Sequence, residues 1–134
     1  MACAAAQAHG SLADLNRRRG ADGLPTTDMY LALHLGAVFY GNVGSKERLD
    51  FTVVGPAVNE VSRIAALCRS LEQPVLLSAT FAAAAGKAKE RLVSVGRYAL
   101  RGVSHAQELF TLDPTWRDPG SEDRNRKREN RQRE

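Results

Sequence analysis

The chain has 134 residues, of which 43% are hydrophobic and 25% charged, a balance typical of one globular domain. Its formal charge of +4 is modest and its basic and acidic residues are interspersed, so a nucleic-acid-binding role is not indicated. No apolar run approaches the roughly 20 residues that span a bilayer, and the alanine-rich start lacks the basic flank of a signal peptide.

The N-terminal half is predicted to contain a helix and a β-hairpin. Residues 2–19 favour a helix, because alanine is the best helix former and two leucines give the segment a short apolar face. Residues 30–43 are predicted to form one strand, interrupted by a bend or bulge at Gly36 and Gly41, and residues 49–54 a second strand. A turn over residues 44–47 joins them, so the two strands are expected to pair.

A helix is predicted to follow the hairpin directly. Gly55 ends the second strand, and Pro56 suits the first turn of a helix because its missing N–H is not needed there. Apolar residues then recur at helical spacing and predict one buried face, made by Val58, Val61, Ala65 and Cys68 and flanked by Ile64 and Leu71. Cys68 is therefore interpreted as a core residue.

The remaining ordered part is predicted to consist of short strands and one short helix. The expected elements are a strand over residues 74–78, a helix over residues 78–85 that Ser78 caps, and strands over residues 91–95 and 108–112. Residues 113–134 are rich in Arg, Glu, Asp and Asn and are predicted to form a charged, disordered tail, because they cannot bury a core. Charges of both signs alternate there, which favours a solvated tail over binding to RNA or an acidic membrane.

The cysteines and histidines indicate no metal or redox site. Cys3 and Cys68 are far apart and form no metal-binding pattern with a histidine, so no zinc site is expected. Unpatterned cysteines suit a reducing compartment, and we expect a cytoplasmic protein. His34 is interpreted as a packed or edge histidine of the first strand, and His105 as a solvated residue in a turn.

One candidate binding site follows from residue spacing alone. Asn59 lies in the opening turns of the helix after Gly55, and Arg63 follows four residues later, so both project from one face. A helix start with an amide and a guanidinium nearby suits an anion. The alternative is that Arg63 pairs with Glu60 or Glu47, and spacing alone favours that structural role.

A longer stretch of the sequence carries a family resemblance. Residues 50–55 (Asp-Phe-Thr-Val-Val-Gly), the pair Val58-Asn59 and the pair Ser62-Arg63 resemble the signature of class III nucleotidyl (adenylate and guanylate) cyclases. Residues 34–45, 74–78 and 100–103 also resemble that family, in the expected order. The resemblance implies that residues 1–112 are a partial cyclase catalytic domain. Its fold would be α/β (α+β) and ferredoxin-like, lacking the family's N-terminal strands and helices.

The resemblance also implies roles for individual residues. In the family, an asparagine matched by Asn59 orients the ribose, and an arginine matched by Arg63 stabilises the phosphates in the transition state. Thr52 matches the base-reading position, often aspartate in the family and threonine in a bacterial type of adenylate cyclase. Because threonine both donates and accepts, it separates ATP from GTP less sharply than a carboxylate. Arg101 corresponds to a late lysine that contacts phosphates, and it keeps the positive charge.

The family's catalytic metal site has no counterpart in this sequence. The complete family domain holds two divalent metal ions, Mg²⁺ or Mn²⁺, on two aspartates that precede the matched segment, and no residue here corresponds to them. We therefore expect no metal ligand in this chain, which should not cyclise ATP efficiently by itself. Family members are dimers with sites at the interface, so the resemblance implies a homodimer or a pairing with an intact cyclase domain.

Three functions are compatible with these features. The first is part of an adenylate cyclase, which converts ATP to 3′,5′-cyclic AMP and pyrophosphate for intracellular signalling. The second is a catalytically inactive cyclase-like module that regulates an intact cyclase or binds a nucleotide. The third is an inert remnant that its charged tail keeps soluble. The joint presence of Thr52, Asn59 and Arg63 favours the first.

Overall fold

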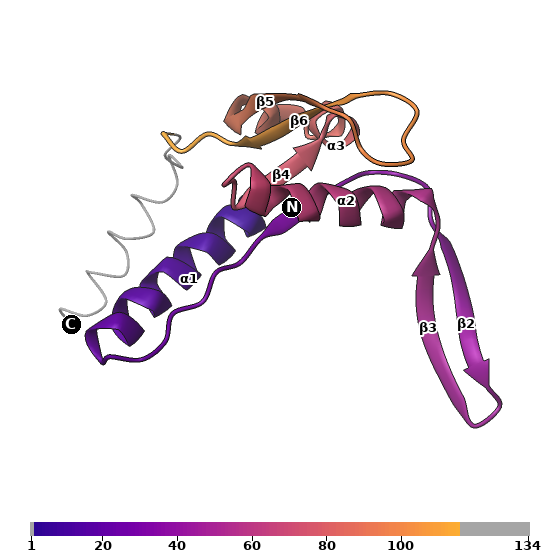
Figure 1. Cartoon of the computed structure of the whole chain (residues 1–134), viewed down its shortest axis with the longest axis horizontal. Helices are drawn as coiled ribbons and strands as arrows, with labels where there is room; N and C mark the ends of the chain where they lie inside the picture. The colour runs from indigo at the N-terminus through magenta and orange to yellow at the C-terminus, as the bar shows by residue number, and fades with distance from the viewer. Residues whose placement is uncertain (1, 116–134) are drawn as a thin grey trace.

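The structure is a computed structural model that describes residues 2–115 (Figure 1). Its helices are α1 (Ala2–Ala21), α2 (Pro56–Ser70), α3 (Ala79–Ala84) and the 3₁₀ helix η1 (Gly86–Arg91). Its strands are β1 (Leu31–Leu33), β2 (Phe39–Ser45), β3 (Arg48–Val54), β4 (Val75–Ser78), β5 (Leu92–Tyr98) and β6 (Gln107–Leu112). No helix of the described part is both long and apolar enough to cross a bilayer. Most of the predicted tail, residues 116–134, lies outside the described residues.

Four strands form one mixed sheet, in the order β1-β4-β6-β5. β1 runs parallel to β4, whereas the β4–β6 and β5–β6 pairs are antiparallel. β2 and β3 form a separate antiparallel hairpin that extends away from this sheet in Figure 1. β1 is thus an edge strand, and within residues 2–115 no strand pairs with its other side.

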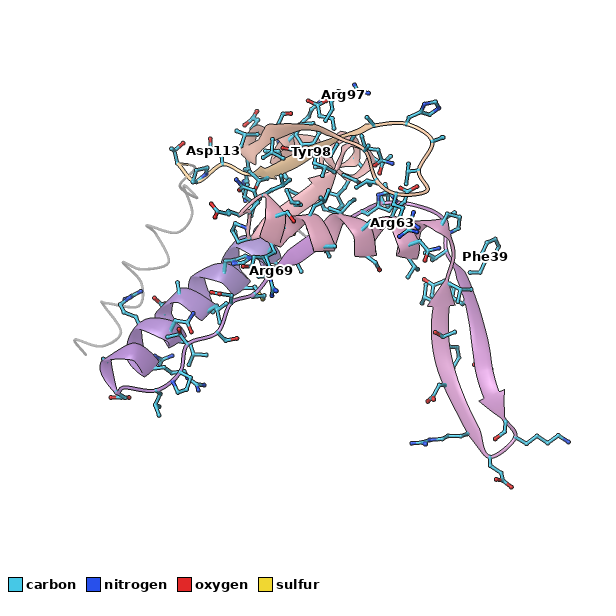
Figure 2. The ribbon with its side chains drawn as sticks, viewed as in Figure 1. Phe39, Arg63, Arg69, Arg97, Tyr98 and Asp113 are labelled. Atoms are coloured by element: carbon cyan, nitrogen blue, oxygen red, sulfur yellow. The ribbon has the colours of Figure 1, made fainter. Side chains whose placement is uncertain are left out.

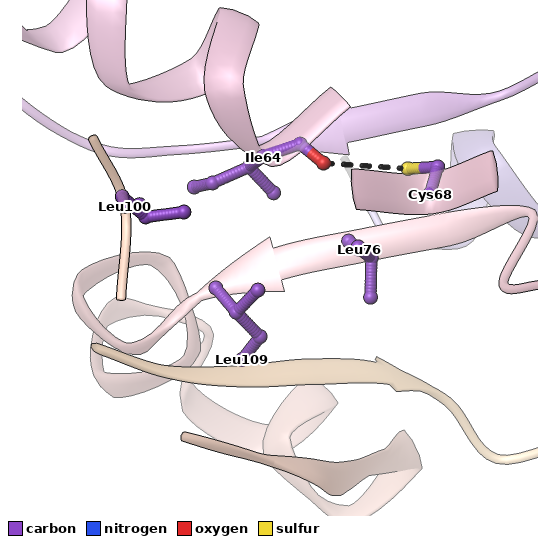
Figure 3. Close-up of a cluster of buried hydrophobic side chains, with 5 residues drawn as sticks. All are labelled: Ile64, Cys68, Leu76, Leu100 and Leu109. Atoms are coloured by element: carbon purple, nitrogen blue, oxygen red, sulfur yellow. Dashed lines mark hydrogen bonds between the residues drawn. The ribbon is translucent and has the colours of Figure 1, made fainter. Parts of the chain in front are cut away.

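Helix α2 packs on the four-stranded sheet and supplies the centre of the core (Figure 3). Ile64 and Cys68 of α2 are fully buried with Leu76 of β4, Leu109 of β6 and Leu100 of the loop after β5. Burying a side chain such as Ile64 contributes about 1.5–3 kcal/mol. Burial also raises the pKa of the Cys68 thiol. The prediction that Cys68 is a core residue is confirmed.

The prediction of one strand over residues 30–43 is wrong, because two strands in different sheets occupy this region. β1 ends at Leu33 and β2 begins at Phe39. Between them the chain passes so close to α2 that a Cβ on Gly36 would lie 2.7 Å from the Cβ of Ala57. Glycine therefore separates two strands here, by allowing a close approach to a helix, and does not bend a single strand.

The buried face of α2 also differs from the predicted one. Val58, Val61 and Ala65, predicted to be buried, are only half-buried. The buried residues are Ala57, Ile64 and Cys68, so burial is confirmed for Cys68 and for the flanking Ile64, whereas Leu71 is half-buried. The buried face is therefore rotated about the helix axis, because α2 meets the sheet through Ile64 and the Gly36 segment through Ala57. The sequence also does not predict η1 or the extension of β5 to Tyr98.

Candidate functional site

The candidate site is built around the start of α2. Gly55 precedes the helix with a φ of 144°, and a Cβ there would lie 3.2 Å from the carbonyl oxygen of Ala37. Only glycine adopts this backbone conformation readily. Pro56 then occupies the first turn of α2, as predicted. This sharp junction fixes where the hairpin ends and where the helix that carries Asn59 and Arg63 begins.

Arg63 contacts the loop that joins β5 to β6. Figure 2 places Arg63 toward the hairpin end of α2, beneath this loop. A Cβ on Gly102 would lie 3.0 Å from one terminal nitrogen of the Arg63 guanidinium and 3.3 Å from the other. Gly102 has a φ of +74° and belongs to a turn closed by the Val103 N–H, which donates to the Leu100 carbonyl at 3.0 Å. The guanidinium therefore packs on the backbone of the turn that carries Arg101.

The four predicted site residues keep their side-chain polar groups free. Among residues 2–115, the side chains of Thr52, Asn59, Arg63 and Arg101 form no hydrogen bond or ion pair with one another or with other residues. Asn59 and Arg101 are exposed, whereas Arg63 and Thr52 are half-buried. A half-buried guanidinium with no counter-charge favours an anion, because its partial desolvation is then compensated by the ligand.

Thr52 lies apart from this cluster. It sits on β3 opposite Gly41 of β2, three residues before Gly55. The fold thus brings Arg63 together with the Arg101 turn and holds Asn59 one helical turn before Arg63, while Thr52 belongs to the hairpin. The strand that carries Thr52 and the helix that carries Asn59 are joined at Gly55.

Neither of the two acidic residues considered as partners of Arg63, Glu60 and Glu47, pairs with it in the structure. The Glu60 carboxylate pairs with His34, whose Nε2 lies 3.1 Å from Glu60 Oε2. Glu47 is exposed in the turn at the far end of the hairpin. No ion pair of Arg63 is found in the described part of the chain. The side chain of His34 is 6% exposed, which confirms its interpretation as a packed histidine, and His105 is exposed, also as predicted.

The described residues offer no centre for a metal ion. Residues 2–115 contain no group of three or more His, Cys, Asp or Glu side chains that could hold one. The donor set for the two divalent ions of a cyclase therefore does not fit this part of the chain, and the ions would need ligands from elsewhere. Sequence reasoning missed two features of the site, the close contact between Arg63 and Gly102 and the pairing of His34 with Glu60. A glycine directly after Arg101 is the one local signal for the first.

Several known proteins are similar in sequence. The chain is 36% identical over 92 residues to an uncharacterised protein of Mycobacterium tuberculosis, a match covering 68% of this chain and 17% of that protein. It is 32% identical over 102 residues to adenylate cyclase 1 of Rhizobium meliloti, covering 68% of this chain and 15% of that protein. The chain thus spans about a sixth of the length of these relatives. A comparison with protein-family models gives no match.

Solved cyclase structures share the fold. The guanylyl cyclase Cya2 superposes with a TM-score of 0.61 and 23% identity, covering 86% of this chain and 58% of that one. The adenylyl cyclase CyaB from P. aeruginosa gives a TM-score of 0.61 at 22% identity, covering 83% and 56%. A bacterial light-regulated adenylyl cyclase gives 0.51 at 29% identity, covering 60% and 22%. The described residues therefore have the mixed α/β fold of the class III nucleotidyl cyclase domain and correspond to part of it.

Proposed function

We propose that this chain supplies the ribose- and phosphate-binding side of a composite adenylate cyclase site. The observation that carries the proposal is the packing of the half-buried, unpaired Arg63 guanidinium on the Arg101 turn, one helical turn after Asn59. Two guanidinium groups with no acidic partner suit the phosphates of a nucleotide. Sequence similarity to proteins named adenylate cyclase supports ATP as the nucleotide.

The proposed reaction requires positioning and charge stabilisation from the protein. The ribose 3′-hydroxyl oxygen attacks the α-phosphorus of ATP, the bond from that phosphorus to the bridging oxygen breaks, and pyrophosphate leaves. The hydroxyl proton is released, so the products are 3′,5′-cyclic AMP, pyrophosphate and a proton. Asn59 would hold the ribose through its amide, which both donates and accepts. Arg63 and Arg101 would stabilise the negative charge that moves onto the phosphate oxygens.

A second polypeptide segment is part of the proposal, because residues 2–115 lack a metal-binding carboxylate cluster. The hairpin provides a surface for a second copy of this chain or for an intact cyclase domain. Tyr40 of β2 is 77% exposed, and Phe39 and Phe51 are 68% and 85% exposed. By the strand register, Tyr40 and Phe51 lie on one face of the hairpin and Phe39 lies on the other. Aromatic side chains exposed this openly on a hairpin indicate an interaction surface. Thr52 shares the face of Phe39, so docking on that face would place the proposed base-reading residue at the interface.

A complementation assay tests the composite site. The full chain is mixed with a homologous adenylate cyclase that keeps its own metal ligands but has alanine at its matched asparagine and arginine positions. We expect cyclic AMP formation from the mixture and none from either protein alone. Arg63→Ala in this chain should remove most of the restored activity, whereas Arg18→Ala, a change of an exposed arginine on α1, should not.

Two results would contradict the proposal. One is a mixed complex, detected by size-exclusion chromatography, that forms no cyclic AMP. The other is restored activity that is independent of Arg63, which would assign the phosphate contacts to the other protein.

A catalytically inactive nucleotide-binding module is the second candidate. The lack of a metal centre in the described residues favours it for the chain acting alone. ATP binding to the pure chain, without turnover in any mixture, would support this module over the composite enzyme.

A further inference from the structure

A buried polar network lies beside the proposed nucleotide contacts and is not used by them. At its centre is His34, which follows β1 and whose side chain is 6% exposed. The His34 Nε2 faces Glu60 of α2 at 3.1 Å, and its Nδ1 faces the Ser78 hydroxyl at the end of β4 at 2.9 Å. Thr80 of α3 lies 2.9 Å from Ser78 and 3.4 Å from His34 Nδ1. The network therefore ties together two strands of the sheet, α3 and the first turns of α2.

The two hydroxyl groups of this network also form hydrogen bonds to the backbone. Ser78 is fully buried and caps α3 by accepting a hydrogen bond from the Phe81 N–H at 3.2 Å. The Thr80 hydroxyl donates to the Leu35 carbonyl at 3.0 Å. Either oxygen can be the donor in the 2.9 Å contact between the two hydroxyls, and the Ser78 hydroxyl shares a further hydrogen bond with His34 Nδ1.

The ring of His34 makes a contact through each of its nitrogens. Glu60 is an acceptor when ionised, so His34 Nε2 donates to it across 3.1 Å. Nδ1 and the Ser78 hydroxyl, 2.9 Å apart, share a second hydrogen bond, in which the tautomer of the ring decides the donor. Polar groups buried this deeply are costly to leave unsatisfied, so the two contacts hold the ring in place.

The arrangement of serine, histidine and acid is not that of a nucleophile and its base. Ser78 is closed to solvent and already serves as the helix cap of α3. Its hydroxyl oxygen accepts from the Phe81 N–H and contacts both Thr80 and His34, so it has no open approach to a substrate.

We propose that the contact between His34 and Glu60 forms a clamp that positions the start of α2 on the sheet. Glu60 lies between Asn59 and Arg63 in the sequence, so the clamp acts on the turns that carry both residues. Gln107 at the start of β6 adds a second contact, its Nε2 donating to Glu60 Oε2 at 3.4 Å. Among the described contacts of His34, Glu60 is the charged group that faces the ring. His34 and Glu60 are thus positioning residues, and their effect on a nucleotide rests on the proposed function.

The segment around His34 is packed too tightly for the ring to move freely. A Cβ on Gly36 would lie 2.9 Å from His34 Nε2 as well as touching Ala57. Side chain, glycine backbone and the first turn of α2 are therefore in mutual contact. A shift of α2 would separate Glu60 from the ring, and loss of this contact would in turn loosen the helix start.

The test begins with the ¹⁵N-labelled full chain and reads the ring nitrogens of its histidines by NMR at neutral pH. We expect the Nε2 proton of His34 to be observed as a hydrogen-bonded proton in slow exchange with water, with exposed His105 as the reference for a solvated ring. In Glu60→Gln that proton should exchange faster. A His34 ring proton that exchanges as fast as that of His105 in the unsubstituted chain would overturn the proposal. This readout involves no nucleotide, so it decides the clamp even where ATP binding fails.

The positioning role is read in a second measurement on the same variants. The N–H groups of Val58 and Asn59, which donate to the Gly55 carbonyl at 3.1 Å and 3.4 Å, should exchange faster with solvent in Glu60→Gln. ATP affinity should fall roughly two- to thirtyfold, the range typical of residues that act through a network. The control Glu90→Gln, an exposed carboxylate in η1, should change neither. Unchanged exchange in Glu60→Gln would refute the clamp. Faster exchange with no ATP binding by any chain would leave the clamp standing and refute the proposed function.

Discussion

Replacing Gly102 by alanine tests whether the Arg101 turn holds Arg63 in place. Gly102 has a φ of +74°, and alanine in that region costs about 1–2 kcal/mol of stability. The added Cβ would lie 3.0 Å from an Arg63 guanidinium nitrogen, closer than ordinary contact, so the guanidinium must shift by a few tenths of an ångström. Misplacing a charge-assisted hydrogen bond to phosphate should cost about 1 kcal/mol, or roughly fivefold in Kd for ATP.

Gly86 provides a matched control for this substitution. It also has a positive φ, +58°, but a Cβ there would meet nothing within 4 Å. Urea denaturation should therefore show similar losses of stability for Gly86→Ala and Gly102→Ala. A fluorescent ATP analogue should bind more weakly only to Gly102→Ala, and this difference should disappear when Arg63→Ala is present in both chains. Equal affinities for the two glycine variants, or an effect that persists without Arg63, would refute the reasoning.

Two further predictions concern the hairpin and the core. Phe51→Asp, at a side chain that is 85% exposed, should prevent self-association without lowering the free energy of unfolding. Sedimentation measures the oligomeric state and urea denaturation measures the stability. An unchanged oligomeric state would show that the hairpin is not part of the interface. In a Cys3→Ser chain, Cys68 should react with a maleimide at pH 8 at least about a thousandfold more slowly when folded than in urea, because burial hinders access and raises the pKa of the thiol. Because the pKa of the folded thiol is raised, the unfolded thiol ionises first, and the free energy of unfolding should fall as the pH rises through the alkaline range. Rapid labelling of the folded chain would contradict the expected protection of Cys68, and a free energy of unfolding that does not fall with pH would contradict the raised pKa.

Local signals in the sequence were sufficient for the elements that surround the site. The hairpin, the start of α2 at Pro56 and the capping of α3 by Ser78 are predicted and observed. Each depends on the conformational limits of one residue or on one short-range hydrogen bond. The Ser78 hydroxyl, for example, accepts from an N–H only three residues away. Interactions between residues this close in the sequence can be predicted from the neighbouring residues.

Features set by tertiary contact were not predictable in this way. The strand expected over residues 30–43 is interrupted because Gly36 meets Ala57 of α2, a partner about twenty positions later. The pairing of Glu60 with His34 depends on the same approach, and spacing along α2 suggested Arg63 as its partner. Helical spacing gives the period of the buried face of α2, but its rotation depends on which strands the helix meets.

The open edge of β1 and the clamp on α2 belong to one structural unit. β1 pairs with β4 on one side only within residues 2–115, so its other side presents backbone N–H and C=O groups to any strand that adds there. His34 comes directly after β1 and contacts Glu60. A strand that pairs with β1 would fix the position of His34 and, through Glu60, that of Asn59 and Arg63. Such a strand would thus also order the residues proposed to contact the phosphates, which would couple strand addition at β1 to the proposed nucleotide binding.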